Sequence, residues 1–262
     1  MRLPFVYIAS LRRTGSTVLS EALTRLPHGF IFREPLLGEG KFQVKTADRE
    51  RWKEHGIDLD LFARDLAADS SLEANAAIAF RDRLLPRLLE VVSQVGVKEI
   101  FHDGWRRYAR AFPGMKVLLT GRDPRDLYLS LHARIHESGG KRWPGRFHPE
   151  SAAADLNRQF RFQFEMFEDC DCMKVRYEDL CTDPGLFDQV KRFCESPIPG
   201  IGDIGSFNAS NPKRIAEYEL HRDQITDQRI GRWKREPDEA LRSQAGEIPA
   251  LMPEYCRFWG YD

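Results

Sequence analysis

Short apolar runs recur along the chain, and segments in which apolar residues follow helical spacing separate them. The apolar runs predict strands over residues 5–9, 29–32, 96–101, 115–120 and 172–177. The run at 115–120 is apolar enough for a central strand of a parallel sheet, which is buried on both faces. Strands that alternate with helices predict an α/β fold, with a central, mainly parallel sheet flanked by helices.

Apolar residues at helical spacing predict the helices of this fold. The predicted helices cover residues 15–26, 59–66, 78–92, 123–136, 151–168, 186–194, 214–224 and 238–258. Pro86 lies inside one of them, and we expect it either to kink that helix or to start a second one. Residues 36–57 show no periodicity and are expected to be irregular. Residues 197–211 are rich in glycine, proline and serine and are expected to be mostly loop.

The first predicted strand leads into the first helix through a basic turn that is rich in hydroxyl groups. Backbone N–H groups and the positive end of the helix dipole converge at such a helix start, where they bind anions. The side chains that could add charge or hydroxyl donors are those of Arg12, Arg13, Thr14, Ser16 and Thr17. The turn therefore predicts a phosphate site, although an N-capped surface turn has a similar composition.

A second basic site follows the strand predicted at 115–120. Arg122 lies directly after that strand, and Ser130 lies eight residues later, about two turns into the next helix. Asp123 fits the N-cap of this helix and Pro124 fits its first turn. Two phosphate-type sites on one sheet predict a ligand with two separated anionic groups. The alternative is a surface cluster of ion pairs formed by Arg122, Asp123, Arg125 and Asp126.

Composition narrows the class of protein. The length of 262 residues fits a single domain over residues 1–262. Forty basic residues balance forty acidic ones, so neither nucleic acid nor a membrane surface is expected as a partner. No apolar run is long enough to cross a membrane, and the five cysteines form no regular framework. We therefore expect a cytoplasmic protein with reduced thiols.

The sequence does not favour a metal site. The turn after the first strand lacks the Gly-x-x-x-x-Gly-Lys-[Ser/Thr] pattern of nucleoside-triphosphate loops, and no second strand clearly ends in a magnesium-binding aspartate. Cys170 and Cys172 lie too close together for the usual zinc spacing, and no second pair accompanies them. We expect no metal.

The motifs resemble those of sulfotransferases that use 3′-phosphoadenosine 5′-phosphosulfate (PAPS). The run Arg-Thr-Gly-Ser-Thr at 13–17 resembles the family's 5′-phosphosulfate loop, and Arg122 with Ser130 resembles its 3′-phosphate site. Tyr177, within Val-Arg-Tyr-Glu-Asp-Leu, is similar to a tyrosine beside the adenine. The run Gly-Arg-Trp-Lys at 231–234 resembles a C-terminal segment that folds over the nucleotide.

The resemblance covers about residues 4–261 and is weak between 36 and 95. It implies the P-loop-like sulfotransferase architecture, PAPS as co-substrate, and no metal. The nucleotide-binding residues that it implies are Arg12, Arg13, Thr14, Gly15, Ser16, Thr17, Arg122, Ser130, Tyr177, Gly231, Arg232 and Trp233.

The resemblance also implies catalytic residues. Arg13 stands where the family carries a lysine or arginine that stabilises the leaving phosphate oxygen. Glu34, after the second strand, resembles a glutamate of the protein-tyrosine branch that takes the proton of the acceptor; an Arg33–Glu34 ion pair is the alternative. His102 is the second candidate base, because a histidine follows the third strand in the small-molecule branch, although its register differs here. Glu99 is the third candidate.

Two other functions stay open from the sequence. One is a metal-dependent P-loop nucleotide kinase or hydrolase, and the other is a nucleotide-binding scaffold without catalysis. For a sulfotransferase, the acceptor is expected to be a small molecule, a carbohydrate or a peptide. The segments expected to form its pocket, 36–57, 137–149 and 197–211, carry no motif that identifies it. The sequence does not indicate an oligomeric state.

Overall fold

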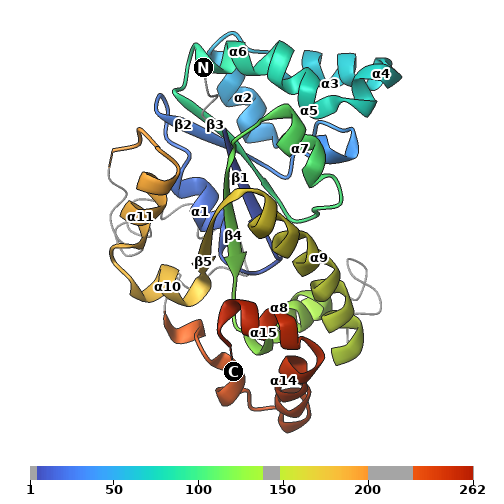
Figure 1. The fold of residues 1–262 in the computed structure, drawn as a ribbon, viewed down its shortest axis with the longest axis vertical. Coiled ribbons are helices and arrows are strands. Elements are labelled where there is room, and N and C mark those ends of the chain that lie inside the picture. Colours follow the sequence, from blue (N-terminus) through green and yellow to red (C-terminus); the bar gives the residue numbers. More distant parts are fainter. Residues whose placement is uncertain (1–4, 138–147, 200–226, 262) are drawn as a thin grey trace.

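The structure is a computed structural model that describes residues 5–137, 148–199 and 227–261. Its centre is a parallel sheet with the strand order β2-β3-β1-β4-β5, around which the helices pack (Figure 1). The strands are β1 (Phe5–Ser10), β2 (Gly29–Arg33), β3 (Gln94–Glu99), β4 (Lys116–Gly121) and β5 (Asp171–Arg176). The predicted α/β class is confirmed, and the predicted strands lie close to the observed ones.

The central strand β1 contributes to a core on each face of the sheet. Alternate residues of a strand point to opposite faces. Tyr7 and Ala9 accordingly belong to the larger core, whereas Val6 and Ile8 belong to the smaller one. Every residue of β1 is buried, which explains why this strand reads as a continuous apolar run.

Three helices cover the smaller core: α1 (Ser16–Ala22), α10 (Tyr177–Thr182) and α11 (Leu186–Phe193). They lie on one side of the sheet, opposite the long helix α9 (Figure 1). The other α-helices are α2 (Thr46–Glu54), α3 (Leu59–Ala68), α4 (Ser70–Ala74), α5 (Ala76–Ala79), α6 (Leu85–Leu89), α7 (Trp105–Ala111), α8 (Pro124–Glu137), α9 (Pro149–Asp169), α14 (Glu239–Leu251) and α15 (Pro253–Trp259). Shorter turns are η1 (Leu37–Glu39), the π-helical η2 (Phe80–Leu84), η4 (Asp227–Arg229) and η5 (Arg232–Arg235).

The expectation that residues 36–57 are irregular is wrong in part, because α2 and η1 form there. Trp52 anchors α2: its side chain is fully buried, and its ring lies 5.0 Å from that of Phe30. Most other positions of α2 are exposed or charged. One buried tryptophan thus holds a helix whose remaining residues show no apolar periodicity.

The helix predicted over 78–92 is divided into α5, η2 and α6. Pro86 lies in the first turn of α6, a position that suits proline. It therefore starts a second helix, as one of the two alternatives expected. The predicted helix at 214–224 lies outside the described residues, as does most of 137–149 and 197–211.

All five strands end at the same edge of the sheet because they are parallel. In the order of the sheet, Glu34 follows β2, the segment 100–104 follows β3, and residues 11–17, called here the β1 loop, follow β1. Arg122 follows β4 and Tyr177 follows β5. The fold thus brings most of the predicted site residues to one edge. In the described part of the chain, no helix is long and apolar enough to cross a membrane.

Candidate active site

The β1 loop turns sharply because two of its residues have left-handed backbone conformations. Arg13 has φ 71° and Gly15 has φ 81°. Glycine suits such a position because it has no Cβ. A Cβ at Gly15 would also lie 3.0 Å from the ring of Tyr177 and 3.1 Å from Leu180. The loop is therefore packed closely against the start of α10.

Hydrogen bonds inside the protein hold the β1 loop in place. The Thr14 hydroxyl donates to the carbonyl of Leu11 at 2.6 Å and contacts the Thr120 hydroxyl at 2.5 Å. The Ser10 hydroxyl contacts that of Ser16 at 2.5 Å. The expectation that the Thr14 hydroxyl donates to an anion is therefore wrong, because that hydroxyl faces inward and is fully buried.

The backbone of the β1 loop keeps the donors that an anion needs. Within the described residues, no protein acceptor bonds the backbone N–H of Gly15, Ser16 or Thr17. These groups open helix α1, where N–H groups lack partners within the helix and the dipole is positive. The predicted anion site at this loop therefore depends on main-chain donors more than on hydroxyls.

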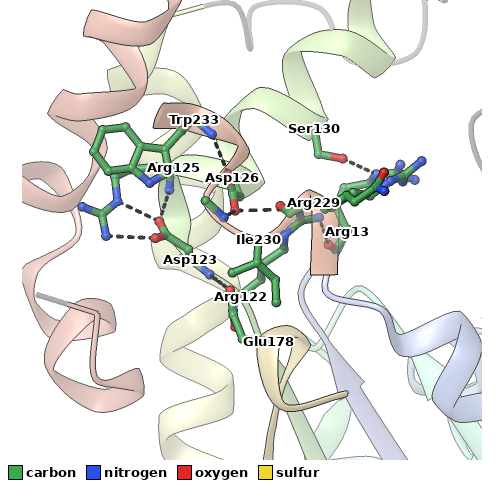
Figure 2. A network of polar contacts seen from close by, with 12 residues as sticks. Arg13, Arg122, Asp123, Arg125, Asp126, Ser130, Glu178, Arg229, Ile230 and Trp233 are labelled. Carbon is green, nitrogen blue, oxygen red and sulfur yellow. Dashed lines mark hydrogen bonds and ion pairs between the residues drawn. The ribbon is translucent and has the colours of Figure 1, made fainter. Parts of the chain in front are cut away.

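The two arginines of the β1 loop point to different partners. Arg12 forms an ion pair with Asp155 at 3.3 Å, and its guanidinium lies over the ring of Phe101. Arg13 instead donates from Nε to the hydroxyl of Ser130 at 2.8 Å. Arg12 thus supports the loop, and Arg13 joins the β1 loop to helix α8. Figure 2 shows the Arg13 side chain beside Ser130.

Arg122 links the ends of three strands. Its side chain is almost fully buried, and its guanidinium lies 4.2 Å from the centre of the Tyr177 ring. Nη1 donates to the carbonyl of Arg13 at 3.4 Å, and Nη2 donates to the carbonyl of Arg229 at 2.9 Å. The two basic sites predicted from the sequence are therefore neighbours in space, and the alternative of a surface ion-pair cluster is wrong for Arg122.

Asp123 and Arg125 form a partly buried ion pair beside Arg122. Asp123 caps α8 by accepting the N–H of Arg125 at 2.9 Å, as predicted, and it also pairs with the Arg125 guanidinium at 2.8 Å. That guanidinium lies 4.5 Å from the centre of the Trp233 ring. Glu178 accepts the N–H of Asp123 at 3.0 Å, which ties α8 to the start of α10.

Residues 229–235, called here the strap, lie against the start of α8 (Figure 2). The buried carboxylate of Asp126 accepts the N–H of Gly231 at 2.8 Å and that of Trp233 at 2.9 Å. Gly231 has φ 63°, which lets both N–H groups face the same carboxylate. Gly231, Arg232 and Trp233 are the strap residues predicted to bind the nucleotide. Unlike the other two, whose N–H groups bond Asp126, Arg232 has a half-exposed side chain that lies 3.8 Å from Glu236.

Glu34 follows β2 and forms an ion pair with Lys98 at the end of β3. Burial alone would raise the pKa of Glu34, but the charge and hydrogen bond of the Lys98 ammonium lower it below its ordinary value. Arg33 pairs with Glu21 at 2.9 Å, so the alternative of an Arg33–Glu34 ion pair is wrong. The backbone of Glu34 has φ 59°, an uncommon conformation that residues other than glycine adopt mainly at constrained sites.

Sequence reasoning missed Lys98. Its side chain is only 5% exposed, and its ammonium lies against the Glu34 carboxylate. Arg33 and Lys98 are opposite each other in the sheet register, and the Glu34 N–H bonds the Lys98 carbonyl at 2.6 Å. A lysine within a predicted strand of the parallel sheet, where charged side chains are rarely fully buried, was the signal that could have identified it.

His102 is fully buried, and both of its ring nitrogens have partners. Nε2 lies 3.1 Å from the carbonyl of Ser10, and Nδ1 lies 3.2 Å from the hydroxyl of Tyr7. Burial lowers the pKa of His102 to about 4. The neutral ring therefore donates from Nε2 and accepts at Nδ1, and it holds the chain where the β1 loop begins.

Glu99 is also buried, and its hydrogen bonds are to residues other than Glu34. Its Oε1 accepts the Tyr108 hydroxyl at 2.5 Å and the N–H of Leu36 at 2.9 Å. Burial raises the pKa of Glu99 to about 8, despite these hydrogen bonds. The Tyr108 hydroxyl also accepts the N–H of Leu37 at 3.1 Å. Glu99 thus fixes the chain that follows Glu34 and holds a proton at neutral pH.

Replacing Glu99 by glutamine is expected to change how stability depends on pH. Between about pH 4.5 and pH 8 the folded protein keeps the Glu99 proton, which the unfolded chain releases. The free energy of unfolding of the natural chain therefore falls as pH rises, by up to about 1.4 kcal/mol per pH unit. Glutamine cannot ionise, so the stability of Glu99→Gln relative to the natural chain should increase from pH 5 to pH 8.

Urea unfolding at three pH values across this range tests the expectation. Glu168→Gln serves as the control, because Glu168 is an exposed residue of the same type on α9. If the stability difference between Glu99→Gln and the natural chain stays constant with pH, the inference that buried Glu99 is protonated at neutral pH is wrong.

The described residues contain no candidate metal site. No group of three or more histidine, cysteine, aspartate or glutamate side chains is arranged to hold a metal ion there. The five cysteines, all of which lie in the described ranges, form no disulfide. Burial raises the pKa of Cys172 to about 12, so this thiol is neither a thiolate ligand nor a nucleophile at neutral pH.

Comparisons with known proteins give one consistent result. A model of the sulfotransferase family matches residues 4–198. The sulfotransferase domain of the olefin synthase of Synechococcus PCC 7002 shares 15% identity, with a TM-score of 0.56 over 100% of this chain and 97% of that one. The sulfotransferase STF9 of Mycobacterium avium shares 12% identity, with a TM-score of 0.52 over 100% of this chain and 78% of that one. No curated protein matches the chain.

Proposed function

The chain belongs to the sulfotransferase family, and from that premise we propose that it transfers the sulfuryl group of PAPS to a hydroxyl or amine acceptor. One observation carries the proposal: a row of complementary groups follows the carboxyl edge of the sheet. The anionic Glu34 lies after β2, the β1 loop with its main-chain donors lies in the middle, and the buried cation Arg122 lies after β4. Such a row suits an acceptor at one end and a nucleotide with two anionic groups at the other.

The donor would bind on the side of β1 and β4. The N–H groups of Gly15, Ser16 and Thr17 suit the 5′-phosphosulfate, because helix starts bind such anions. Arg122 suits the 3′-phosphate, since its guanidinium is buried and can form charge-assisted hydrogen bonds. Tyr177, which already packs against Arg122 and Gly15, forms an apolar wall for the adenosine.

The transfer would be an in-line displacement at sulfur. The acceptor oxygen or nitrogen forms a bond to sulfur, and the bond between sulfur and the phosphate oxygen breaks. That phosphate oxygen keeps the electron pair and gains negative charge, which the Arg13 guanidinium and the loop N–H groups stabilise. The proton of the acceptor passes to the carboxylate of Glu34.

Glu34 is the preferred base among the three candidates. Its pKa is lowered, so its carboxylate is deprotonated at neutral pH, and its side chain is 39% exposed. His102 is fully buried, with both nitrogens bonded to protein groups. Glu99 is buried and protonated at neutral pH. Among the three candidates, Glu34 alone therefore combines a deprotonated carboxylate at neutral pH with access to solvent.

The acceptor would approach from the side of β2 and β3. Helix α2 and the turn η1 follow Glu34 in the chain, and we propose that they form one wall of that side. We keep a small molecule, a carbohydrate or a peptide as acceptor classes, because the segments 138–147 and 200–211 lie outside the described residues. A kinase or hydrolase of the P-loop type is less well supported, because the family match is to sulfotransferases.

Replacing Arg122 by alanine is expected to weaken the binding of one nucleotide much more than that of another. Binding of adenosine 3′,5′-bisphosphate should weaken by at least about tenfold, since hydrogen bonds to charged groups contribute roughly 1.5–3 kcal/mol each. Binding of adenosine 5′-phosphosulfate, which lacks the 3′-phosphate, should change much less. Titration calorimetry with both nucleotides measures the difference.

Arg125→Ala is the matched control for this experiment. Arg125 lies three residues after Arg122, in the first turn of α8, and its guanidinium pairs with Asp123 outside the contacts of Arg122. It should leave the ratio of the two affinities close to that of the natural chain. Equal losses for both nucleotides in Arg122→Ala would contradict the 3′-phosphate role.

Tight bisphosphate binding without transfer to any of a panel of sugar, phenol, alcohol and peptide acceptors would favour the non-catalytic scaffold.

A further inference from the structure

The strap is held to helix α8 by its backbone, at one carboxylate. Asp126 accepts the N–H of Gly231 through Oδ2 and the N–H of Trp233 through Oδ1. Its side chain has no exposed surface, and Figure 2 shows it between the strap and Arg122. A buried carboxylate that binds two backbone N–H groups fixes both the position and the register of the strap, because it leaves no side-chain freedom in the contact.

Arg122 holds the same strap at a second point. Its Nη2 donates to the carbonyl of Arg229 at 2.9 Å and lies 3.9 Å from Oδ2 of Asp126. A carbonyl oxygen on a buried guanidinium takes a place that a phosphate oxygen would bind more strongly, because the phosphate is charged. The contact of the strap with Arg122 is therefore exchangeable with an anion, whereas the contacts at Asp126 are not.

We propose that Asp126 is a positioning residue for nucleotide binding, which pins the strap at Gly231 and Trp233 while an incoming phosphate replaces the Arg229 carbonyl on Arg122. The proposal rests on the proposed function, in which Arg122 binds the 3′-phosphate. It adds that the strap stays registered over the site when its contact with Arg122 is exchanged. Asp126 itself touches neither the nucleotide nor the reacting atoms.

A purely electrostatic role for Asp126 predicts the opposite effect on binding. Asp126 places a negative charge beside Arg122, so its neutralisation alone would strengthen the attraction of Arg122 for an anion. Loss of the strap's register would weaken binding instead. The sign of the change in affinity therefore distinguishes a positioning residue from a neighbouring charge.

The first test uses the natural chain and Asp126→Asn without any ligand. Asparagine keeps one acceptor oxygen, but its NH₂ group faces the other N–H donor of the strap. Hydrogen exchange should then be about tenfold faster at Gly231, Trp233 or both, since a hydrogen bond to a charged acceptor contributes roughly 1.5 kcal/mol or more. Asp171→Asn is the control, because Asp171 is ion-paired with Lys116 at the opposite end of β4.

The second test measures adenosine 3′,5′-bisphosphate binding and steady-state kinetics for the same proteins. We expect binding about tenfold weaker in Asp126→Asn, a raised KM for the donor, and an unchanged KM for the acceptor. Unchanged exchange at both amides, or bisphosphate binding that is equal or tighter, overturns the proposal. If the natural chain itself does not bind the bisphosphate, the proposed donor is wrong, and the exchange experiment alone decides whether Asp126 pins the strap.

Discussion

Replacing Glu34 by glutamine is expected to lower turnover by roughly 10²–10⁴-fold, the range that a general base contributes. Binding of adenosine 3′,5′-bisphosphate should stay unchanged, because Glu34 lies after β2, on the far side of β3 from the β1 loop. The lowered pKa of Glu34 also predicts that kcat/KM of the natural chain stays level down to the ordinary pKa of a glutamate. Single-turnover and steady-state assays with a responsive acceptor measure both effects.

Glu21→Gln is the matched control for Glu34→Gln. Like Glu34, Glu21 is a glutamate in an ion pair. Its partner is Arg33, the residue that precedes Glu34, at 2.9 Å. It should cost stability without a comparable loss of turnover. Turnover retained in Glu34→Gln would return the role of base to His102, in spite of its burial. A Glu34→Asp variant separates loss of the carboxylate from loss of its position, since it should recover part of the rate.

Replacing Arg13 by alanine is expected to lower kcat by roughly 10²–10³-fold, as removal of one group that stabilises a developing oxyanion does. Arg13 also donates to Ser130 at 2.8 Å, so a smaller loss of nucleotide affinity should accompany it. Arg13→Lys should recover part of kcat, because it keeps the positive charge. Comparison of kcat with the dissociation constant of the bisphosphate separates the two effects.

Arg12→Ala provides the contrast for Arg13. Arg12 is paired with Asp155 and packs on Phe101. Its loss should therefore lower the melting temperature, with a smaller loss of kcat than in Arg13→Ala. If Arg12→Ala and Arg13→Ala reduce kcat equally, the loop arginines act only by supporting the loop. The assignment of Arg13 to the leaving oxygen would then be wrong.

The sequence predicted those parts of the site that depend on local structure. A strand, a turn with Gly15 and a helix start follow one another within a few residues, so their geometry can be inferred from spacing. The same holds for Arg122, Asp123 and Pro124 at the start of α8. In each case the backbone direction of neighbouring residues decides where the donors lie.

The contacts that could not be predicted join residues far apart in the chain. Glu34 and Lys98 meet because β2 and β3 pair in one particular register. Asp126 meets Gly231 and Trp233 across more than a hundred residues. No local signal identifies the partner in either contact, since a charged residue at a strand end or in a first helical turn is ordinary. The inward turn of the Thr14 hydroxyl depends likewise on the neighbouring strand β4.

The order of the strands has a consequence for how such a protein can diversify. Residues 29–99 supply β2, β3 and the helices between them, on one flank of β1. Residues 116–261 supply β4, β5, α8 and the strap on the other flank. The strands of each flank are thus supplied by one uninterrupted stretch of sequence. Recombination or drift within the first stretch can remodel the surroundings of Glu34 while the machinery around Arg122 is inherited intact.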